Sequence, residues 1–164
     1  MSIVVSTSIS RMINYFEADA PRINHALKVY GFAKSIGELE GLQEEQLETL
    51  EIAAVLHDIG IKESERKYSS HAGHYQELEG PPVARELLGD LGLSSEVLNR
   101  ICFLIGHHHT YTKIDGIDFQ ILVEADFLVN IFEEGMKKEE IRTVRGKYFK
   151  TAAAVRYLEG MYEI

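Results

Sequence analysis

Apolar residues recur at helical spacing along almost the whole chain, and this pattern constrains the fold more than any other feature. A period near 3.6 residues is typical of an amphipathic α-helix, whereas a half-buried strand alternates apolar and polar residues. Alternating, β-branched runs are nearly absent from this sequence. The pattern therefore predicts an all-α fold, a single-domain bundle of about six to eight helices.

Capping residues, glycines and prolines divide the chain into the expected helices. Asp19 and the Ser94-Ser95 pair are predicted N-terminal caps, and Pro81-Pro82 is predicted to open a helix. Residues 60–80 are polar and contain several serines and glycines, so we expect a long loop there. The expected helices cover approximately residues 10–17, 21–37, 43–58, 81–91, 95 to the histidine triplet at 107–109, 118–134, 138–145 and 147–159.

The composition restricts the class of protein. With 164 residues, 45% of them hydrophobic, the chain 1–164 is expected to form one domain with its own core. The only cysteine, Cys102, excludes an internal disulfide and favours a reducing, cytoplasmic location. The N-terminus does not resemble a signal peptide, and no apolar run is long enough to span a membrane, so no membrane partner is expected. A net charge of −9 disfavours binding to a nucleic-acid polymer, although a bound divalent cation would still allow a small anionic substrate.

Four of the expected helices each place one polar residue on an apolar stripe. His25 shares its stripe with Val29, Phe32 and Ile36. His57 continues the stripe of Leu47, Leu50 and Ala54. In the same way, His108 follows Val97, Ile101 and Leu104, and Asp126 follows Phe119 and Leu122. All four side chains are therefore predicted to point inward.

Each of these residues has an ordinary explanation when it is taken alone. A single histidine on an apolar face is usually a hydrogen-bonded core residue, and Asp126 could be bonded to a backbone or hydroxyl group. However, no basic residue lies between Ile114 and Met136 to pair with Asp126, and a buried, unpaired carboxylate is costly. Four inward histidine and carboxylate side chains from separate helices predict a metal site inside a bundle.

The order His25, His57-Asp58, Asp126 on a helical chain resembles the HD-domain superfamily of metal-dependent phosphohydrolases, in particular its small bacterial-type members. The resemblance covers about residues 20–135, and residues 137–164 resemble a helical C-terminal extension. It implies that these four residues ligate one metal. It also implies that His107 and His108 ligate a second ion. A further ligand of that ion could be His71, His74 or Glu79, or none of these.

The resemblance implies hydrolysis of a phosphate ester or anhydride by metal-activated water, in a small phosphorylated metabolite, plausibly a nucleotide. Asp58 and His108 are the expected catalytic residues. Asp58 lies about 100° around the helix from His57 and could bridge two metals or take the proton from water. The nearest basic residues in sequence, Lys62, Arg66 and Lys67, are candidate phosphate ligands, and the segment containing Tyr111, Lys113 and Asp115-Gly116 is a candidate rim.

Several alternatives remain open on the sequence alone. The ligand types suit one or two divalent ions of Fe, Mn, Co, Ni, Zn or Mg. A di-iron oxygenase of the same fold is an alternative to the hydrolase, and a non-catalytic sensor that binds a metal or a ligand is another. The oligomeric state is also open, with a homo-oligomer among the allowed states.

Overall fold

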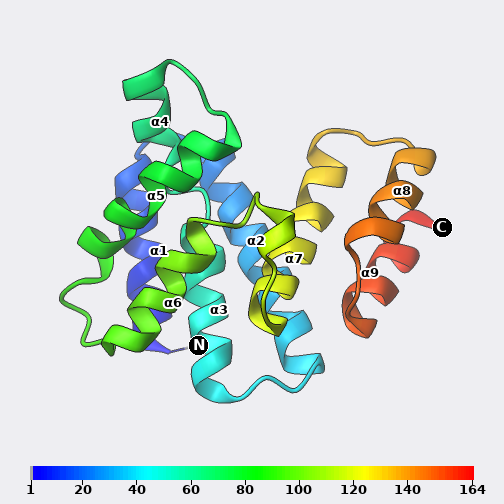
Figure 1. Cartoon of the computed structure of the whole chain (residues 1–164), viewed down its shortest axis with the longest axis horizontal. Coiled ribbons are helices and arrows are strands. Elements are labelled where there is room, and N and C mark those ends of the chain that lie inside the picture. Colours follow the sequence, from blue (N-terminus) through cyan, green and yellow to red (C-terminus); the bar gives the residue numbers. More distant parts are fainter. Residues whose placement is uncertain (1) are drawn as a thin grey trace.

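The computed structural model describes residues 2–164, and within that range it contains α-helices, one 3-10 helix and no strand (Figure 1). The all-α prediction is confirmed. The described chain forms nine α-helices rather than six to eight. They are α1 (Ile3–Phe16), α2 (Ala20–Leu39), α3 (Glu44–Leu56), α4 (Ile61–Tyr68), α5 (Gly73–Leu88), α6 (Ser95–Ile105), α7 (Ile117–Glu133), α8 (Lys138–Tyr148) and α9 (Ala152–Tyr162), with the 3-10 helix η1 (Tyr111–Lys113) between α6 and α7.

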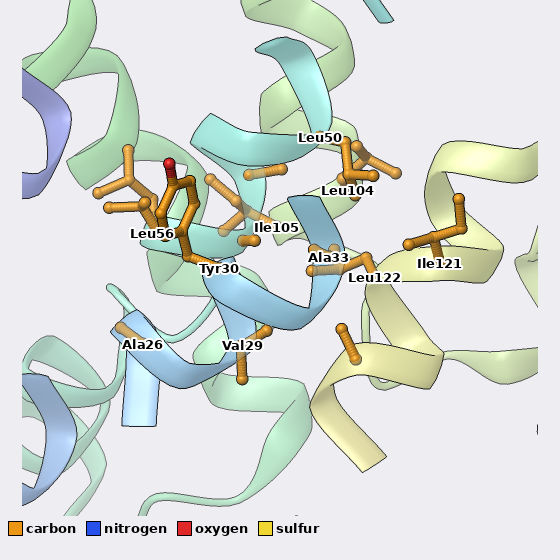
Figure 2. Packing of buried hydrophobic residues seen from close by; sticks show 14 of the residues in the cluster. Ala26, Val29, Tyr30, Ala33, Leu50, Leu56, Leu104, Ile105, Ile121 and Leu122 are labelled. Atoms are coloured by element: carbon orange, nitrogen blue, oxygen red, sulfur yellow. The ribbon is translucent and has the colours of Figure 1, made fainter. Parts of the chain in front are cut away.

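Helices α2, α3 and α7 form the centre of the bundle. Helix α2 packs along both α3 and α7, while α1 and α6 cover α3 and the α8–α9 pair covers α7. Helices α1, α4 and α5 therefore lie at one end of the molecule and α8 and α9 at the other (Figure 1). Apolar side chains of α2, α3, α6 and α7 gather between these helices (Figure 2).

The predicted inward registers are confirmed. Val29 and Ile36 of α2 are fully buried, as are Ile101 and Leu104 of α6. The polar residues of the same stripes are buried with them, since His57, His108 and Asp126 are 0%, 1% and 6% exposed. The helices that make the core therefore also carry the histidine and carboxylate groups into it.

The predicted caps are confirmed as well. The Asp19 carboxylate accepts a hydrogen bond from the backbone N–H of Arg22 at 3.3 Å, and the Ser94 hydroxyl accepts one from that of Val97 at 3.2 Å. The first helix is longer than predicted, because Ser2 caps it at Ile3. The hydroxyl groups of Thr7 and Ser8 donate to carbonyls one turn earlier, so these polar residues do not interrupt the helix.

The long loop predicted at residues 60–80 is wrong. This segment forms α4 and the first half of α5, separated by a short turn in which Ser69 adopts a left-handed conformation with φ 52°. The prediction failed because α4 has few apolar residues and therefore shows no clear helical period. Of these residues, Ile61 is buried. Helix α4 packs mainly on α5, and a periodicity argument does not detect such a contact between helices.

The prediction that Pro81-Pro82 opens a helix is also wrong, because both prolines lie inside α5. A proline inside a helix removes a backbone hydrogen bond and usually ends or kinks it. Here the surroundings accommodate the pair: Pro81 packs against Gly106, where an added Cβ would lie 3.2 Å from the proline ring. Tertiary packing therefore outweighs the local preference.

The C-terminal pair of helices is held to the core by a buried carboxylate. Glu124 of α7 accepts hydrogen bonds from the backbone N–H groups of Lys150 and Thr151, at 2.6 and 2.9 Å, and from the Thr151 hydroxyl at 2.8 Å. These groups precede α9, so Glu124 fixes where that helix begins. Among the described residues, no helix has the length and apolar character needed to cross a membrane.

The turn before α4 depends on a close contact between two glycines, and we predict that Gly60→Ala destabilises the protein. A Cβ on Gly60 would meet the backbone carbonyl of Gln76 and lie 2.5 Å from the backbone nitrogen of Gly80. Overpacking of this kind costs about 1–3 kcal/mol. Chemical denaturation should show a lower free energy of unfolding for Gly60→Ala.

Gly31→Ala is the matched control, since Gly31 lies inside α2 with nothing within 4 Å of an added Cβ. This change should raise the free energy of unfolding by about 0.5–1 kcal/mol, because alanine favours helix interiors over glycine. Equal effects of the two substitutions would contradict the close-contact explanation.

Candidate metal centre

Three side chains from three central helices form a first ligand group. The ligand atoms of His25, His57 and Asp126 all lie within 4.8 Å of one another. The Nε2 atoms of His25 and His57 are 3.1 Å apart, and Asp126 Oδ1 is 3.2 Å from the first and 3.5 Å from the second. Since α2, α3 and α7 contribute one residue each, packing of these helices creates the group.

A second ligand group lies beside the first and consists of Asp58, His108 and His109. Asp58 follows His57 at the end of α3, and the histidines follow α6. His108 is 1% exposed and places its Nε2 atom 3.2 Å from Asp58 Oδ1.

Asp58 faces both groups at once. Its Oδ2 atom is 3.4 Å from Nε2 of His25 and 3.4 Å from Nε2 of His57, while its Oδ1 atom points to His108. One carboxylate therefore lies between two clusters of nitrogen and oxygen ligands. This is the arrangement that a residue bridging two ions requires.

Hydrogen bonds to the other ring nitrogens orient the histidines. Nδ1 of His57 donates to the carbonyl of Ala54 at 2.7 Å, and Nδ1 of His108 donates to that of Ile105 at 2.8 Å. A carbonyl oxygen only accepts, so Nδ1 carries the hydrogen in both rings and Nε2 faces the ligand group.

His109 is oriented the other way by Gln76. The Gln76 amide nitrogen donates to the carbonyl of His71, so its Oε1 atom is the acceptor for Nε2 of His109 at 3.1 Å. The hydrogen of His109 is then on Nε2, which leaves the lone pair on Nδ1. Burial and the adjacent His108 lower the pKa of His109 to about 4, so the ring is neutral at pH 7.

The carboxylates of Asp58 and Asp126 are both ionised, because the neighbouring histidines hold the pKa of each below its usual value. Burial raises the pKa of Asp126, but hydrogen bonds from His25 and His57 outweigh this effect and hold it well below its usual value. For His57, burial lowers the pKa, and the charges of Asp58 and Asp126 raise it well above the usual value. Negative charge and imidazole nitrogens are thus concentrated at one buried point.

This donor set fits a divalent transition metal. Imidazole nitrogens and carboxylate oxygens suit Fe, Mn, Co, Ni and Zn, and a cation would compensate the charges of Asp58 and the buried Asp126. Each group offers three protein ligands, and a catalytic metal needs further positions left open for water or substrate.

The comparisons with known proteins agree with this geometry. The HD domain family model matches residues 22–154. The chain belongs to the HD domain family. The HD match extends beyond residue 135, where the sequence predicted the core to end, and includes α8.

A crystal structure of a predicted HD superfamily hydrolase from an uncultured Thermotogales bacterium has a similar fold. It aligns with a TM-score of 0.69 and 22% sequence identity, over 95% of this chain and 83% of that chain. Among curated proteins, none matches this sequence.

The structure brings together most of the ligand residues expected of an HD domain, with one exchange in the histidine triplet. His109 belongs to the second group, whereas His107 belongs to neither. His107 stacks on Phe103 and donates from Nδ1 to its carbonyl at 2.7 Å. Only the family resemblance had indicated His107. Helix α6 ends at Ile105, and His107 lies in the turn that follows, packed against Phe103.

The open candidates for a further ligand lie elsewhere. His71 and His74 are exposed, with His71 4.0 Å from a Glu65 oxygen and His74 against the Tyr75 ring. Glu79 is buried, but it accepts hydrogen bonds from Lys67 and the Tyr68 hydroxyl. None of these three belongs to either ligand group.

The candidate phosphate ligands are also engaged outside the two groups. Lys62 donates to the carbonyl of Tyr15, Arg66 pairs with Glu63, and Lys67 pairs with Glu79. In the candidate rim, Asp115 pairs with Arg100 of α6, and Tyr111 packs against Phe127 and Tyr148.

Four contributors to the site were missed by sequence reasoning: His109, Gln76, Asn130 and Glu133. Asn130 donates to Asp126 Oδ1 at 3.0 Å, and Glu133 accepts from His25. Asn130 and Glu133 follow Asp126 by one and two helical turns, so helical spacing could have indicated them. Gln76 and His109 had no comparable signal, because their contact joins α5 to the turn after α6.

We predict that His57→Ala and Asp126→Ala lose bound metal, while His107→Ala retains it. The first two remove a donor from the first ligand group, and His107 lies outside both groups. Elemental analysis of the purified proteins measures the metal content per chain. Full metal occupancy in His57→Ala would contradict the assignment.

His109→Ala tests the second group separately. If two ions bind, this variant should lose one of them and keep the other, because only the second group contains His109. One metal per wild-type chain would instead exclude a two-ion centre.

Proposed function

We propose that this protein is a metal-dependent phosphohydrolase that cleaves a phosphate ester or anhydride of a small phosphorylated metabolite. The observation that carries the proposal is the position of Asp58 between two histidine-containing ligand groups. Membership of the HD domain family, and a similar structure described as a predicted hydrolase, support the same class of reaction.

The ligand groups would hold one or two divalent ions, with His25, His57 and Asp126 at one position and His108 and His109 at the other. When bound, such an ion lowers the pKa of a water ligand and neutralises charge on a phosphoryl oxygen. Asp58 would contact both positions through its two oxygens. In this role Asp58 would orient the attacking water and accept its proton, and His108 would ligate the ion at the second position through Nε2, the atom that faces Asp58 Oδ1.

Phosphate release from a panel of nucleotides and phosphomonoesters tests the reaction. The protein is first stripped of metal and then supplied with each of the candidate divalent ions. We expect turnover with at least one metal and substrate, and a decrease in kcat of about 10²–10⁴-fold in Asp58→Asn. Asp90→Asn is the control, since Asp90 is an exposed carboxylate paired with Arg11 and belongs to neither ligand group.

Absence of phosphate release with all metals and substrates would contradict the proposal and favour a sensor module. Two irons per chain together with oxygen consumption would favour the oxygenase.

A nucleotide is the substrate class that we propose within this reaction. Three aromatic rings, those of Tyr111, Phe127 and Tyr148, pack together beside the ligand groups. Phe127 directly follows Asp126, and it stacks on Tyr148 with ring centroids 4.9 Å apart and planes 13° apart. Tyr111 follows the histidine triplet and lies 4.7 Å from the Tyr148 ring.

The rings retain accessible surface and polar groups. All three residues are partly exposed, and two of them carry a phenol hydroxyl. Burial and the nearby Asp126 carboxylate are the leading causes that raise the pKa of Tyr111 to about 12. An aromatic wall near a phosphate-activating site suits a nucleobase, which binds by stacking.

Tyr148→Leu should lower kcat/KM for a nucleotide by about 5- to 150-fold, the range expected for loss of base stacking. The same variant should hydrolyse ribose 5-phosphate as well as the wild type does. Tyr157→Leu is the control, because Tyr157 of α9 contacts Phe32 of α2 and not the three clustered rings. Equal losses for both substrates in Tyr148→Leu would indicate a structural role for the ring instead.

A further inference from the structure

Glu133, the last residue of α7, reaches across the bundle to His25. Its Oε1 atom lies 2.6 Å from Nδ1 of His25, and its Oε2 atom accepts from Nζ of Lys28 at 3.1 Å. The two contacts use different oxygens, so the carboxylate serves both partners at once. This chain of contacts connects an exposed lysine to the Nε2 atom that faces the first ligand group.

His25 differs from the other histidines in how it can be oriented. His57 and His108 follow helix ends, where carbonyls three residues earlier accept from Nδ1. His25 lies inside α2, where the helix itself uses the neighbouring carbonyls. A side-chain acceptor from another helix is therefore needed to fix its ring.

We propose that Glu133 is a positioning residue of the metal centre, which holds Nδ1–H of His25 so that Nε2 faces the ion. This inference rests on the proposed metal centre. The contact is short and charge-assisted, and hydrogen bonds between a carboxylate and a ligand histidine increase the basicity of the ligand nitrogen.

Burial and charge support a role beyond an ordinary surface ion pair. The side chain of His25 is 13% exposed and that of Glu133 is 30% exposed, so solvent screens this contact less than a fully exposed one. Lys28 lies one helical turn after His25 on the same face of α2. Its ammonium group pairs with the negative charge of Glu133 and restrains that carboxylate. The lysine itself faces no ligand group.

Titration of the metal-free protein with Mn²⁺, followed by calorimetry, tests the inference. We expect Glu133→Ala to weaken Mn²⁺ binding by about 10- to 100-fold, as is typical when the partner of a ligand histidine is removed. Glu133→Gln should show a smaller loss, because its amide oxygen still accepts from His25 but carries no charge.

Two controls separate positioning from other effects. Glu134→Ala removes the same charge one residue away, where no contact to His25 exists, and should bind Mn²⁺ like the wild type. Lys28→Ala breaks the same ion pair from its other side and should leave Mn²⁺ binding within about threefold, because the contact of Glu133 with His25 remains.

Wild-type affinity in both Glu133→Ala and Glu133→Gln would overturn the inference. It would also be overturned if Lys28→Ala lost as much affinity as Glu133→Ala, since the ion pair would then be purely structural. Thermal unfolding of each metal-free variant checks its folding, and Glu133→Gln serves if Glu133→Ala does not fold. Absence of Mn²⁺, Zn²⁺ and Fe²⁺ binding in the wild type would instead refute the metal centre itself.

Discussion

Two ionised carboxylates, Asp58 and Asp126, lie against imidazole rings where the central helices of the bundle meet. The rest of the structure depends on how this charge is compensated, because a buried carboxylate without a partner costs several kcal/mol or more. In the structure the compensation comes from His25, His57 and His108, whose hydrogen bonds hold the pKa values of both carboxylates low. A bound cation would compensate the two carboxylates in place of these histidine hydrogen bonds.

The hydrogen bonds that orient the ligand histidines differ between helix ends and helix interiors. Where a helix ends, as before His57 and His108, the last carbonyls orient the ring without any further residue. Inside a helix that source is absent, and His25 is instead oriented by Glu133 from α7. The central trio of helices therefore supplies the ligands of the first group and the groups that fix them, and the close packing of α2 with α7 is part of the site.

The site is also framed by parts of the chain outside the central trio. Helix α5 contributes Gln76, which orients His109, and α8 contributes Tyr148 to the aromatic cluster beside Asp126. The C-terminal helices thus have two connections to the centre, the aromatic cluster and the buried carboxylate of Glu124. The HD domain match, which continues to residue 154, includes both connections.

Helical periodicity predicted much of the fold, since it placed α2, α3, α6 and α7 and the inward faces of His25, His57 and Asp126. It failed at α4 and at the first half of α5. Helix α4 carries few apolar residues, and a contact between Gly60 and Gly80 fixes its position. The prediction of a helix start at Pro81-Pro82 rested on the local preference of proline alone. Packing of Pro81 against Gly106 lets α5 continue through both prolines.

The sequence by itself determined the helical class, the buried faces and the residue types that suit a metal, because these depend on spacing within single helices. The tertiary structure alone decided that His109 rather than His107 joins the second group, since the chain turns after Ile105. It also decided the placement of Asp58 between two groups and the contact of His25 with Glu133, which is 108 residues away. Contacts between distant residues depend on how helices pack, and no local pattern records that packing.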